Sequence, residues 1–182
     1  MIKGFNFQIK KISDLGEKER GLIKKFLIDV YSDNPDYKNS VYSNPDLNTC
    51  VLMFHNNELI GHTSITRRLV NINHKDFLVS GIGDVAIKPK PQRKGYGKLL
   101  MNKVSEVTIS QDYDLGLLFC HPKLHQFYTD CGWTKKENGK VFALKHGQPE
   151  DQRLTYFLPL KLNQKDKLMW NNADIIIGEG SW

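Results

Sequence analysis

Apolar and polar positions in the first half of the chain follow patterns that predict one helix and several strands. Residues 5–9 alternate, as is typical of a half-buried strand. Apolar side chains recur at helical spacing through residues 22–30, so we expect a helix that begins near Ser13 or Asp14 and ends near Tyr31. Further strands, joined by tight turns at Asn56-Asn57 and near Asn73-His74, should pair antiparallel. These strands are expected at residues 50–54, 58–70 and 77–87.

The second half predicts a buried strand between two helices. A helix is expected over residues 95–109, with one apolar face. Residues 115–119 form a short continuous apolar run, as in a strand buried on both faces and paired in parallel. A second helix over residues 121–131 should end at Gly132. The last part of the chain holds further strand candidates at residues 133–135, 141–144 and 154–158, and an apolar run at 175–177.

Length and composition indicate an ordinary globular protein. With 182 residues, 40% of them hydrophobic, residues 1–182 are expected to form a single domain. No apolar run reaches the roughly eighteen residues that a membrane-spanning helix needs, and the amino terminus lacks the apolar core of a secretory signal. Three cysteines without a CxxC pair suit free thiols in a reducing compartment. We therefore expect a cytoplasmic protein without a membrane partner.

Charge is distributed unevenly along the chain, which carries a formal net charge of +6. An early segment is acidic, with Asp29, Asp33 and Asp36 and no basic residue among them. A later segment, residues 85–105, contains basic residues and no acidic one. Its basic residues are Lys88, Lys90, Arg93, Lys94, Lys98 and Lys103. The sequence thus predicts an anion site in one region and a cation site in another.

A glycine-containing turn links the third of the antiparallel strands to the helix that follows it. Its pattern, Gln92-x-x-Gly95-x-Gly97, is not a phosphate loop, because no G-x-x-x-x-G-K-[ST] spacing occurs there. It is not a dinucleotide fingerprint either, because Leu100 stands where the third glycine belongs. As a bare pattern it is most often an ordinary turn. Its position at a helix amino terminus, however, is that of an anion-binding site.

In context the motif resembles the Gcn5-related N-acetyltransferase (GNAT) family. The similarity covers roughly residues 58–135 and includes a tyrosine, Tyr128, shortly before a Gly-Trp step. It implies a GNAT-type α/β (α+β) fold: a mixed, mostly antiparallel sheet flanked by helices and splayed at the acyl-CoA site. It also implies acetyl-CoA as co-substrate, with Val85 and Ile87 holding the pantetheine arm. The pyrophosphate would lie on the turn formed by Gln92, Arg93, Lys94, Gly95, Tyr96, Gly97 and Lys98.

Two residues are the expected catalysts. The resemblance gives Tyr128 the role of general acid toward the departing thiolate; the alternative is a tyrosine that anchors its helix. Asp84, a carboxylate in an apolar strand, is the best candidate for the base that accepts the proton of the amine, and a buried structural aspartate is the alternative. His62 and His121 are weaker candidates for that role. No cluster of metal ligands is visible in the sequence, and no metal is expected.

The carboxyl-terminal part contains Pro149-Glu150-Asp151, then Leu158-Pro159 on a strand, and a Gly- and acid-rich end with Trp182. In these features it resembles aminoglycoside 2′-N-acetyltransferases, with a strand and tail at residues 154–182 on the acceptor side. This resemblance implies that Asp36, Asp151, Glu179 and the Trp182 carboxylate bind a cationic amine. The carboxylate that the subfamily carries on the central strand falls near Gly83 here, one step from Asp84. One step turns a strand side chain to the opposite face, so either the base is displaced or the acceptor differs.

The expected function is therefore acetyl transfer from acetyl-CoA to a small cationic amine, such as an aminoglycoside, in a ternary complex. Another amine, a peptide or a longer acyl group remains an alternative, and so does a non-catalytic acyl-CoA-binding module. Nucleic-acid binding through residues 88–103 ranks low, because no aromatic reader motif accompanies the basic residues. A homodimer stays open.

Overall fold

The computed structural model describes residues 4–32, 42, 44, 46–89, 95–152 and 154–180. The chain forms two compact units. Unit 1 consists of Met1–Ile65 and Asp84–Val104, and unit 2 of Thr66–Gly83 and Ser105–Trp182. The prediction of a single domain stays a prediction, and each unit is taken by itself below.

Unit 1 is built on the antiparallel strands predicted for the first half of the chain. The order of strands is β1-β2-β3-β4, and β1 pairs with β2 from Phe5 to Lys11. Asn56 and Asn57 both have positive φ, as the tight turn between β2 and β3 requires. The elements are β1 (Phe5–Lys11), α1 (Glu17–Val30), β2 (Leu47–His55), the first part of β3 (Glu58–Ile72), the end of β4 (Lys75–Ile87) and most of α3 (Tyr96–Ser110).

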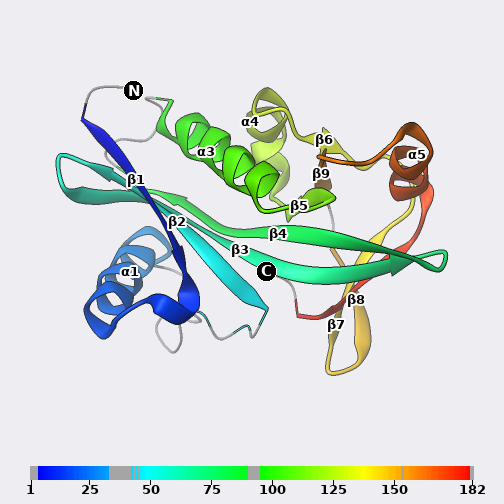
Figure 1. The fold of residues 1–182 in the computed structure, drawn as a ribbon, viewed down its shortest axis with the longest axis horizontal. Helices are drawn as coiled ribbons and strands as arrows, with labels where there is room; N and C mark the ends of the chain where they lie inside the picture. Colours follow the sequence, from blue (N-terminus) through cyan, green and yellow to red (C-terminus); the bar gives the residue numbers. More distant parts are fainter. Residues whose placement is uncertain are drawn as a thin grey trace. The chain divides into compact units, whose positions relative to one another are not determined.

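Helices α1 and α3 lie on opposite sides of the strands of unit 1 (Figure 1). On the α1 side, Phe26 and Leu27 pack against Cys50 and Leu52 of β2 in a buried apolar cluster. On the α3 side, Gly61 lies within van der Waals reach of α3, because a Cβ there would lie 3.5 Å from Leu100. Helix α1 begins later than predicted, since residues 12–14 form a short 3-10 helix and the Gly16 N–H bonds the Glu19 carboxylate instead.

Unit 2 contains the buried parallel strand that the apolar run predicted. In β5 (Leu115–Phe119), Leu115 to Leu118 pair in parallel with Val79 to Ile82 of β4. The order continues to β9 (Thr155–Pro159) and β6 (Thr134–Lys135), both antiparallel. The predicted mixed, mostly antiparallel architecture is confirmed. The second helix is shorter than expected, because Pro122–Leu124 form a 3-10 helix before α4 (His125–Asp130).

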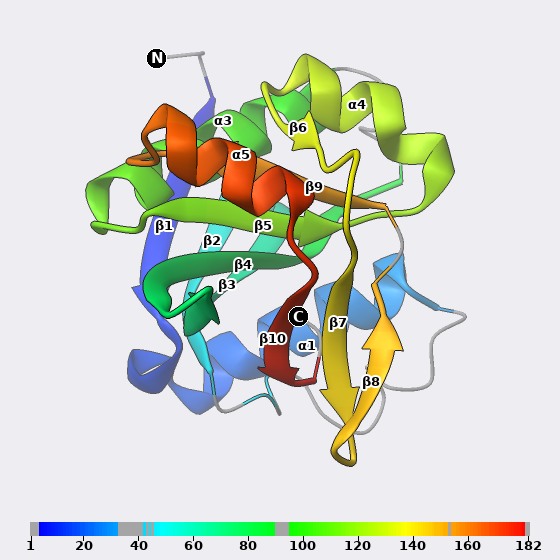
Figure 2. The same cartoon turned by 90° about the vertical axis from the view of Figure 1, so that its right-hand side faces the viewer.

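The end of the chain contains a helix and two strands that the sequence analysis did not assign. Helix α5 (Gln164–Asn172) begins at Asn163, whose side chain accepts a bond of 2.9 Å from the Asp166 N–H. A second sheet has the order β10-β7-β8, and Figure 2 shows its three strands side by side. These strands are β7 (Val141–Lys145), β8 (Gln148–Asp151) and β10 (Ile175–Glu179). In the part of the chain that the structure describes, no helix is long and apolar enough to cross a membrane.

Candidate active site

Strand β4 carries one extra residue, and it lies at Asp84. Strands β3 and β4 meet at a two-residue turn, Asn73-His74, in which both residues have positive φ, and this sets the last residue of β3 opposite the first of β4. Further along, the Lys88 N–H bonds the Ile60 carbonyl at 2.9 Å. Between these two points β4 is one residue longer than β3. Asp84, with a φ of 50°, is the left-handed residue within that stretch, which makes it the bulge.

Because of the bulge, the direction of the Asp84 side chain cannot be inferred from its distance of one residue from Gly83. The inference that one step turns the side chain to the opposite face holds only for a regular strand. At this place the alternation fails, because Asp84 and Val85 are adjacent and both are partly exposed. A bulge re-aims the side chains beside it. The distance of one residue from Gly83 therefore no longer argues against Asp84 as the base.

Side chains from β3 and from the end of α1 hold the bulge. Ser64 donates its hydroxyl to the Asp84 carboxylate at 2.9 Å. His62 Nδ1 lies 3.1 Å from the Asp84 carbonyl oxygen. The Tyr31 hydroxyl donates to the Val85 carbonyl at 2.9 Å. The carboxylate and two successive carbonyls of β4 are thus bonded by three side chains of the same unit.

His62 is completely buried, and its hydrogen bonds define its tautomer. A carbonyl oxygen only accepts, so Nδ1, which faces the Asp84 carbonyl, carries the proton. Nε2 then accepts from the Tyr42 hydroxyl, 2.6 Å away. Burial lowers the pKa of His62, and the nearby Asp84 opposes that shift in part. Burial also raises the pKa of Tyr31 and of Tyr42, so both phenols keep their protons.

Only part of the predicted pyrophosphate turn can be located. Gln92, Arg93 and Lys94 lie outside the described residues. Gly95 has a φ of 79°, a conformation that glycine adopts without strain, and α3 starts at the next residue. The Leu99 N–H bonds the Gly95 carbonyl at 3.1 Å, so the amides of three residues precede the first bonded amide of the helix. These residues are Tyr96, Gly97 and Lys98. Such an arrangement can bind phosphate oxygens, and the helix dipole favours their charge.

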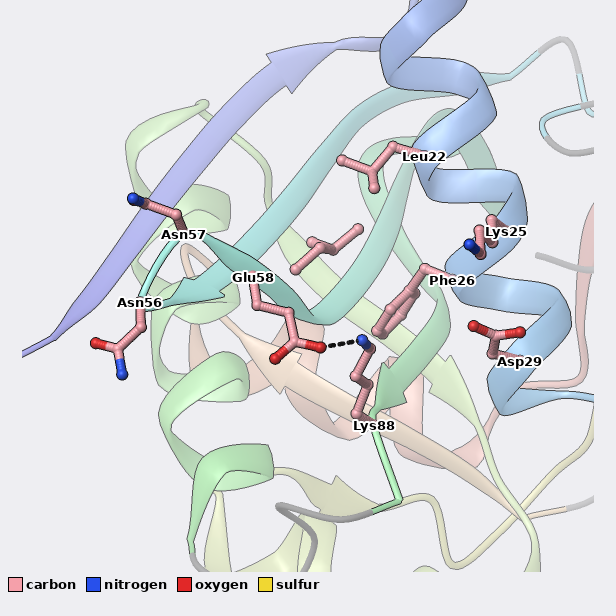
Figure 3. A pocket seen from close by; sticks show the side chains of 9 residues that line it. Leu22, Lys25, Phe26, Asp29, Asn56, Asn57, Glu58 and Lys88 are labelled. Atoms are coloured by element: carbon pink, nitrogen blue, oxygen red, sulfur yellow. Dashed lines mark hydrogen bonds and ion pairs between the residues drawn. The ribbon is translucent and has the colours of Figure 1, made fainter.

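A basic residue ahead of this turn is already neutralised. Lys88 forms an ion pair with Glu58 at the edge of a pocket between α1 and the turn that joins β2 to β3 (Figure 3). Figure 3 shows Leu22 and Phe26 of α1 facing the same hollow. The ammonium group of Lys88 is therefore paired with a carboxylate of the protein itself, rather than reserved for an anionic ligand.

The two predicted contacts with the pantetheine arm lie at the end of β4. The pairing between β4 and β5 ends at Ile82, whereas β4 continues to Ile87. The Ile87 side chain packs over Gly61, since a Cβ at that glycine would lie 2.9 Å from Ile87 Cδ1. Val85 has its carbonyl bonded to Tyr31. The end of β4 thus extends past its pairing with β5, as an added extended segment would require.

Tyr128 lies in unit 2, on α4, and is only 5% exposed. Its ring lies 6.0 Å from that of Tyr156, whose hydroxyl is 2.5 Å from His125 Nδ1. The Gly-Trp step after α4 is a packing feature, because Trp133 presses on Gly116 of β5 so closely that a Cβ at the glycine would lie 2.8 Å from the indole. The burial of Tyr128 also suits a tyrosine that anchors its helix, and the acid role of Tyr128 stays a prediction.

His121, the weaker candidate base in unit 2, has a structural role, and the neighbouring Cys120 is not suited to act as a nucleophile. His121 caps the 3-10 helix that follows it, because its Nδ1 accepts from the Lys123 N–H at 3.2 Å. Burial raises the pKa of Cys120 to about 11, so the thiolate that a nucleophile needs is scarce at neutral pH. Within the described ranges, no three His, Cys, Asp or Glu residues form a group that could hold a metal ion.

The proposed acceptor carboxylates are located only in part. Asp36 and Trp182 lie outside the described residues. Asp151 forms an ion pair of 3.2 Å with Lys140, and Glu179 accepts from the Gly147 N–H at 2.9 Å. By register, Asp151 faces Phe142 and Glu179 faces Leu144, which places both acids on the same face of the small sheet.

Sequence reasoning missed the partners of Asp84. Tyr31 was noted only as the end of a helix, and Ser64 was one polar residue in an apolar strand. Tyr42, which bonds His62, lies in a segment interpreted from the sequence as a loop or a short helix. No local signal joins these residues, because their contacts bridge between 20 and 54 positions of the chain.

Comparison with known proteins identifies the family. The model of the acetyltransferase (GNAT) domain matches residues 11–135, which is more than half of the chain. The chain belongs to the GNAT acetyltransferase family. This GNAT protein resembles Escherichia coli YhbS, solved with CoA, at 13% identity, with 95% of this chain and 89% of the other covered and a TM-score of 0.68.

Two further solved structures have the same fold. Escherichia coli ElaA is 18% identical, with 84% of this chain and 98% of the other covered and a TM-score of 0.61. A GNAT acetyltransferase from Brucella melitensis, solved with acetyl-CoA, is 13% identical, with 87% and 91% covered and a TM-score of 0.56. At such identities the likeness establishes the fold alone. The protein is thus a GNAT N-acetyltransferase whose acceptor these relatives leave open.

Proposed function

We propose that this protein transfers the acetyl group of acetyl-CoA to a small cationic amine, directly and in a ternary complex. The observation that carries the proposal is the bulge at Asp84. It presents a carboxylate, bonded to Ser64, on the strand that continues past its pairing with β5. A carboxylate at the reaction centre can accept the proton that the amine must lose.

The chemistry follows from these groups. Bound acetyl-CoA supplies the thioester carbonyl that the amine attacks. Asp84 takes a proton from the amine, directly or through water, as the new C–N bond forms and the C–S bond breaks. Tyr128 gives its proton to the departing sulfur and recovers it from solvent. Holding both substrates together supplies much of the rate, because a bimolecular step becomes effectively unimolecular.

Coenzyme binding is assigned to the end of β4 and the start of α3. Val85 and Ile87 would hold the pantetheine arm along the strand. The pyrophosphate would lie on the turn of residues 92–98 (Gln92, Arg93, Lys94 and the amides from Gly95 to Lys98). The left-handed Gly95 and the unbonded first turn of α3 support this assignment.

We propose an aminoglycoside-like polyamine as the first acceptor to test. Asp36, Asp151, Glu179 and the Trp182 carboxylate are the candidate binding groups. Among the described residues, the Asp151 carboxylate pairs with Lys140, and the Glu179 carboxylate accepts from the Gly147 N–H. An ionised carboxylate has about four lone-pair sites, so it can accept an ammonium group in addition. We also propose that the protein works in the cytoplasm.

An acceptor screen with thiol detection tests the function. Purified protein and acetyl-CoA are mixed with aminoglycosides, simple amines and peptides, and the release of CoA thiol is recorded. We expect amine-dependent release that falls about 100-fold or more in Tyr128→Phe, the loss typical of a missing general acid. Cys120→Ala is the control and should keep full activity. If no amine releases thiol although acetyl-CoA binds, the proposed function is wrong.

A further inference from the structure

Two side chains outside the catalytic pair hold the backbone of the reaction centre. We propose that His62 and Tyr31 are positioning residues, which fix the successive carbonyls of Asp84 and Val85 so that the Asp84 carboxylate is aimed at the acceptor. This inference rests on the proposed role of Asp84 as base. It assigns His62 a function other than that of a proton acceptor, the role for which it was a weaker candidate.

The need for such support follows from the bulge. Aspartate tolerates a left-handed φ better than most residues, but the conformation is still less favourable than for glycine, and Asp84 has a φ of 50°. At a bulge the ladder of backbone hydrogen bonds is interrupted, and bonds from side chains can fix the carbonyls there. Here the carbonyl of Asp84 has His62 and that of Val85 has Tyr31. Each of these two successive carbonyls therefore has its own side-chain donor.

His62 is in turn fixed by its other neighbour. Its Nε2 accepts from the Tyr42 hydroxyl at 2.6 Å, and the two rings lie 5.8 Å apart. The ring is fully buried, so water does not compete for either nitrogen. The tautomer with the proton on Nδ1 is the one that satisfies both partners. Tyr42 thus orients the imidazole, and the imidazole orients the carbonyl of Asp84.

A matched pair of substitutions separates the two bonds of His62. In His62→Asn the side-chain amide reaches about as far as Nδ1, so it can still donate to the Asp84 carbonyl while the bond to Tyr42 is lost. In His62→Gln the amide reaches about as far as Nε2, which keeps Tyr42 and abandons the carbonyl. If positioning of the carbonyl is what matters, Asn is tolerated and Gln is not.

Tyr31→Phe removes the second donor, and the chain offers a matched control. Tyr113 is 1% exposed, and its hydroxyl has no hydrogen-bond partner among the described residues. Tyr113→Phe therefore deletes a buried hydroxyl that holds nothing, whereas Tyr31→Phe deletes one that holds the Val85 carbonyl. A general effect of losing a buried phenol would appear in both variants.

The experiment compares kcat, the KM for the amine and the Kd for CoA in these four variants, using the best amine of the acceptor screen. We expect kcat to fall about 100-fold in His62→Gln and at least about tenfold in Tyr31→Phe, since small misplacement of a catalytic group has effects of this size. It should change less than about threefold in His62→Asn and Tyr113→Phe. The Kd for CoA should stay within about threefold in the two His62 variants and in Tyr113→Phe, because the phosphate turn is untouched. For Tyr31→Phe the decisive quantity is kcat, because Tyr31 also bonds Val85, a proposed contact of the pantetheine arm.

Two results would overturn the inference. One is a Tyr31→Phe enzyme with the kcat of the wild type. The other is a reversed order of the histidine variants, in which His62→Gln keeps its kcat and His62→Asn loses it. That order would mean that activity depends on the bond between His62 and Tyr42 and not on the bond to the Asp84 carbonyl. A third measurement needs no turnover: ¹⁵N spectra of histidine-labelled protein should show His62 neutral with its proton on Nδ1, and an Nε2 proton contradicts the geometry. Failure of the proposed function differs, because the wild type itself would then release no thiol.

Discussion

Gly139 provides a sharp test of the packing in unit 2. It has a φ of 64° and lies just before β7, against the end of α5. An added Cβ would lie 2.3 Å from the Ala173 carbonyl oxygen and 2.8 Å from that of Asn172. Close by, the Lys140 carbonyl accepts a bond of 2.8 Å from the Ile175 N–H, which joins β7 to the start of β10. We predict that Gly139→Ala strongly destabilises the protein, because it disrupts the packing between the start of β7, the end of α5 and the start of β10.

The cost has two parts that the structure separates. Forcing alanine into a left-handed conformation costs about 1–2 kcal/mol. The close approach adds about 1–3 kcal/mol, the usual cost of overpacking, and it is not relieved by a rotamer change because the opposing atoms are backbone. The free energy of unfolding should thus fall by roughly 2–5 kcal/mol. For a chain of this size this corresponds to a decrease in Tm of about 4–20 °C.

Gly147→Ala is the matched control for this prediction. Gly147 has a φ of 76°, and no atom lies within 4 Å of the Cβ position. It should therefore show only the conformational part of the cost, about 1–2 kcal/mol. Urea unfolding of the wild type and both variants, with the m-value held as a check, gives the difference directly. If Gly139→Ala lowers the free energy of unfolding no more than Gly147→Ala does, the close packing of Gly139 against the end of α5 is contradicted.

Three further predictions concern other parts of the molecule. Gly21→Ala should raise the free energy of unfolding by about 0.5–1 kcal/mol in urea, because Gly21 lies inside α1 with open space around it. Since the folded state lowers the pKa of His62, the unfolded chain binds the proton first as the pH falls. The wild type should therefore lose more stability than His62→Asn between about pH 7 and about pH 5, and equal losses would contradict the buried neutral ring. Cys120, with its pKa raised to about 11, should react with iodoacetamide at pH 8 far more slowly than a free thiol, and rapid labelling would contradict that burial.

Elements that depend on local patterns were predictable from the sequence. The tight turns at Asn56-Asn57 and Asn73-His74 have the positive φ values that their residue types allow. The continuous apolar run of β5 correctly indicated a strand paired in parallel. Helix α5 was missed, because Asp166 and Trp170 are its only buried residues, so it has no apolar stripe to reveal it.

The site was predictable in its parts and not in its arrangement. Asp84 stood out as a carboxylate in an apolar strand, but its bulge depends on pairing between β3 and β4 that no local pattern encodes. The same holds for the tautomer of His62, which is fixed by Tyr42 and by a carbonyl of another strand. Long-range contacts of this kind arise only when the chain is folded.

The initial rate of thiol release, with acetyl-CoA and the amine both varied, tests the central claim most directly. Direct transfer in a ternary complex predicts reciprocal plots that intersect, and no acetylated protein by mass spectrometry when the amine is omitted. Asp84→Asn should retain CoA binding and lose about 100-fold or more in kcat, as expected for a missing general base. Parallel plots with an acetylated enzyme, or an Asp84→Asn variant with the kcat of the wild type, would contradict the account.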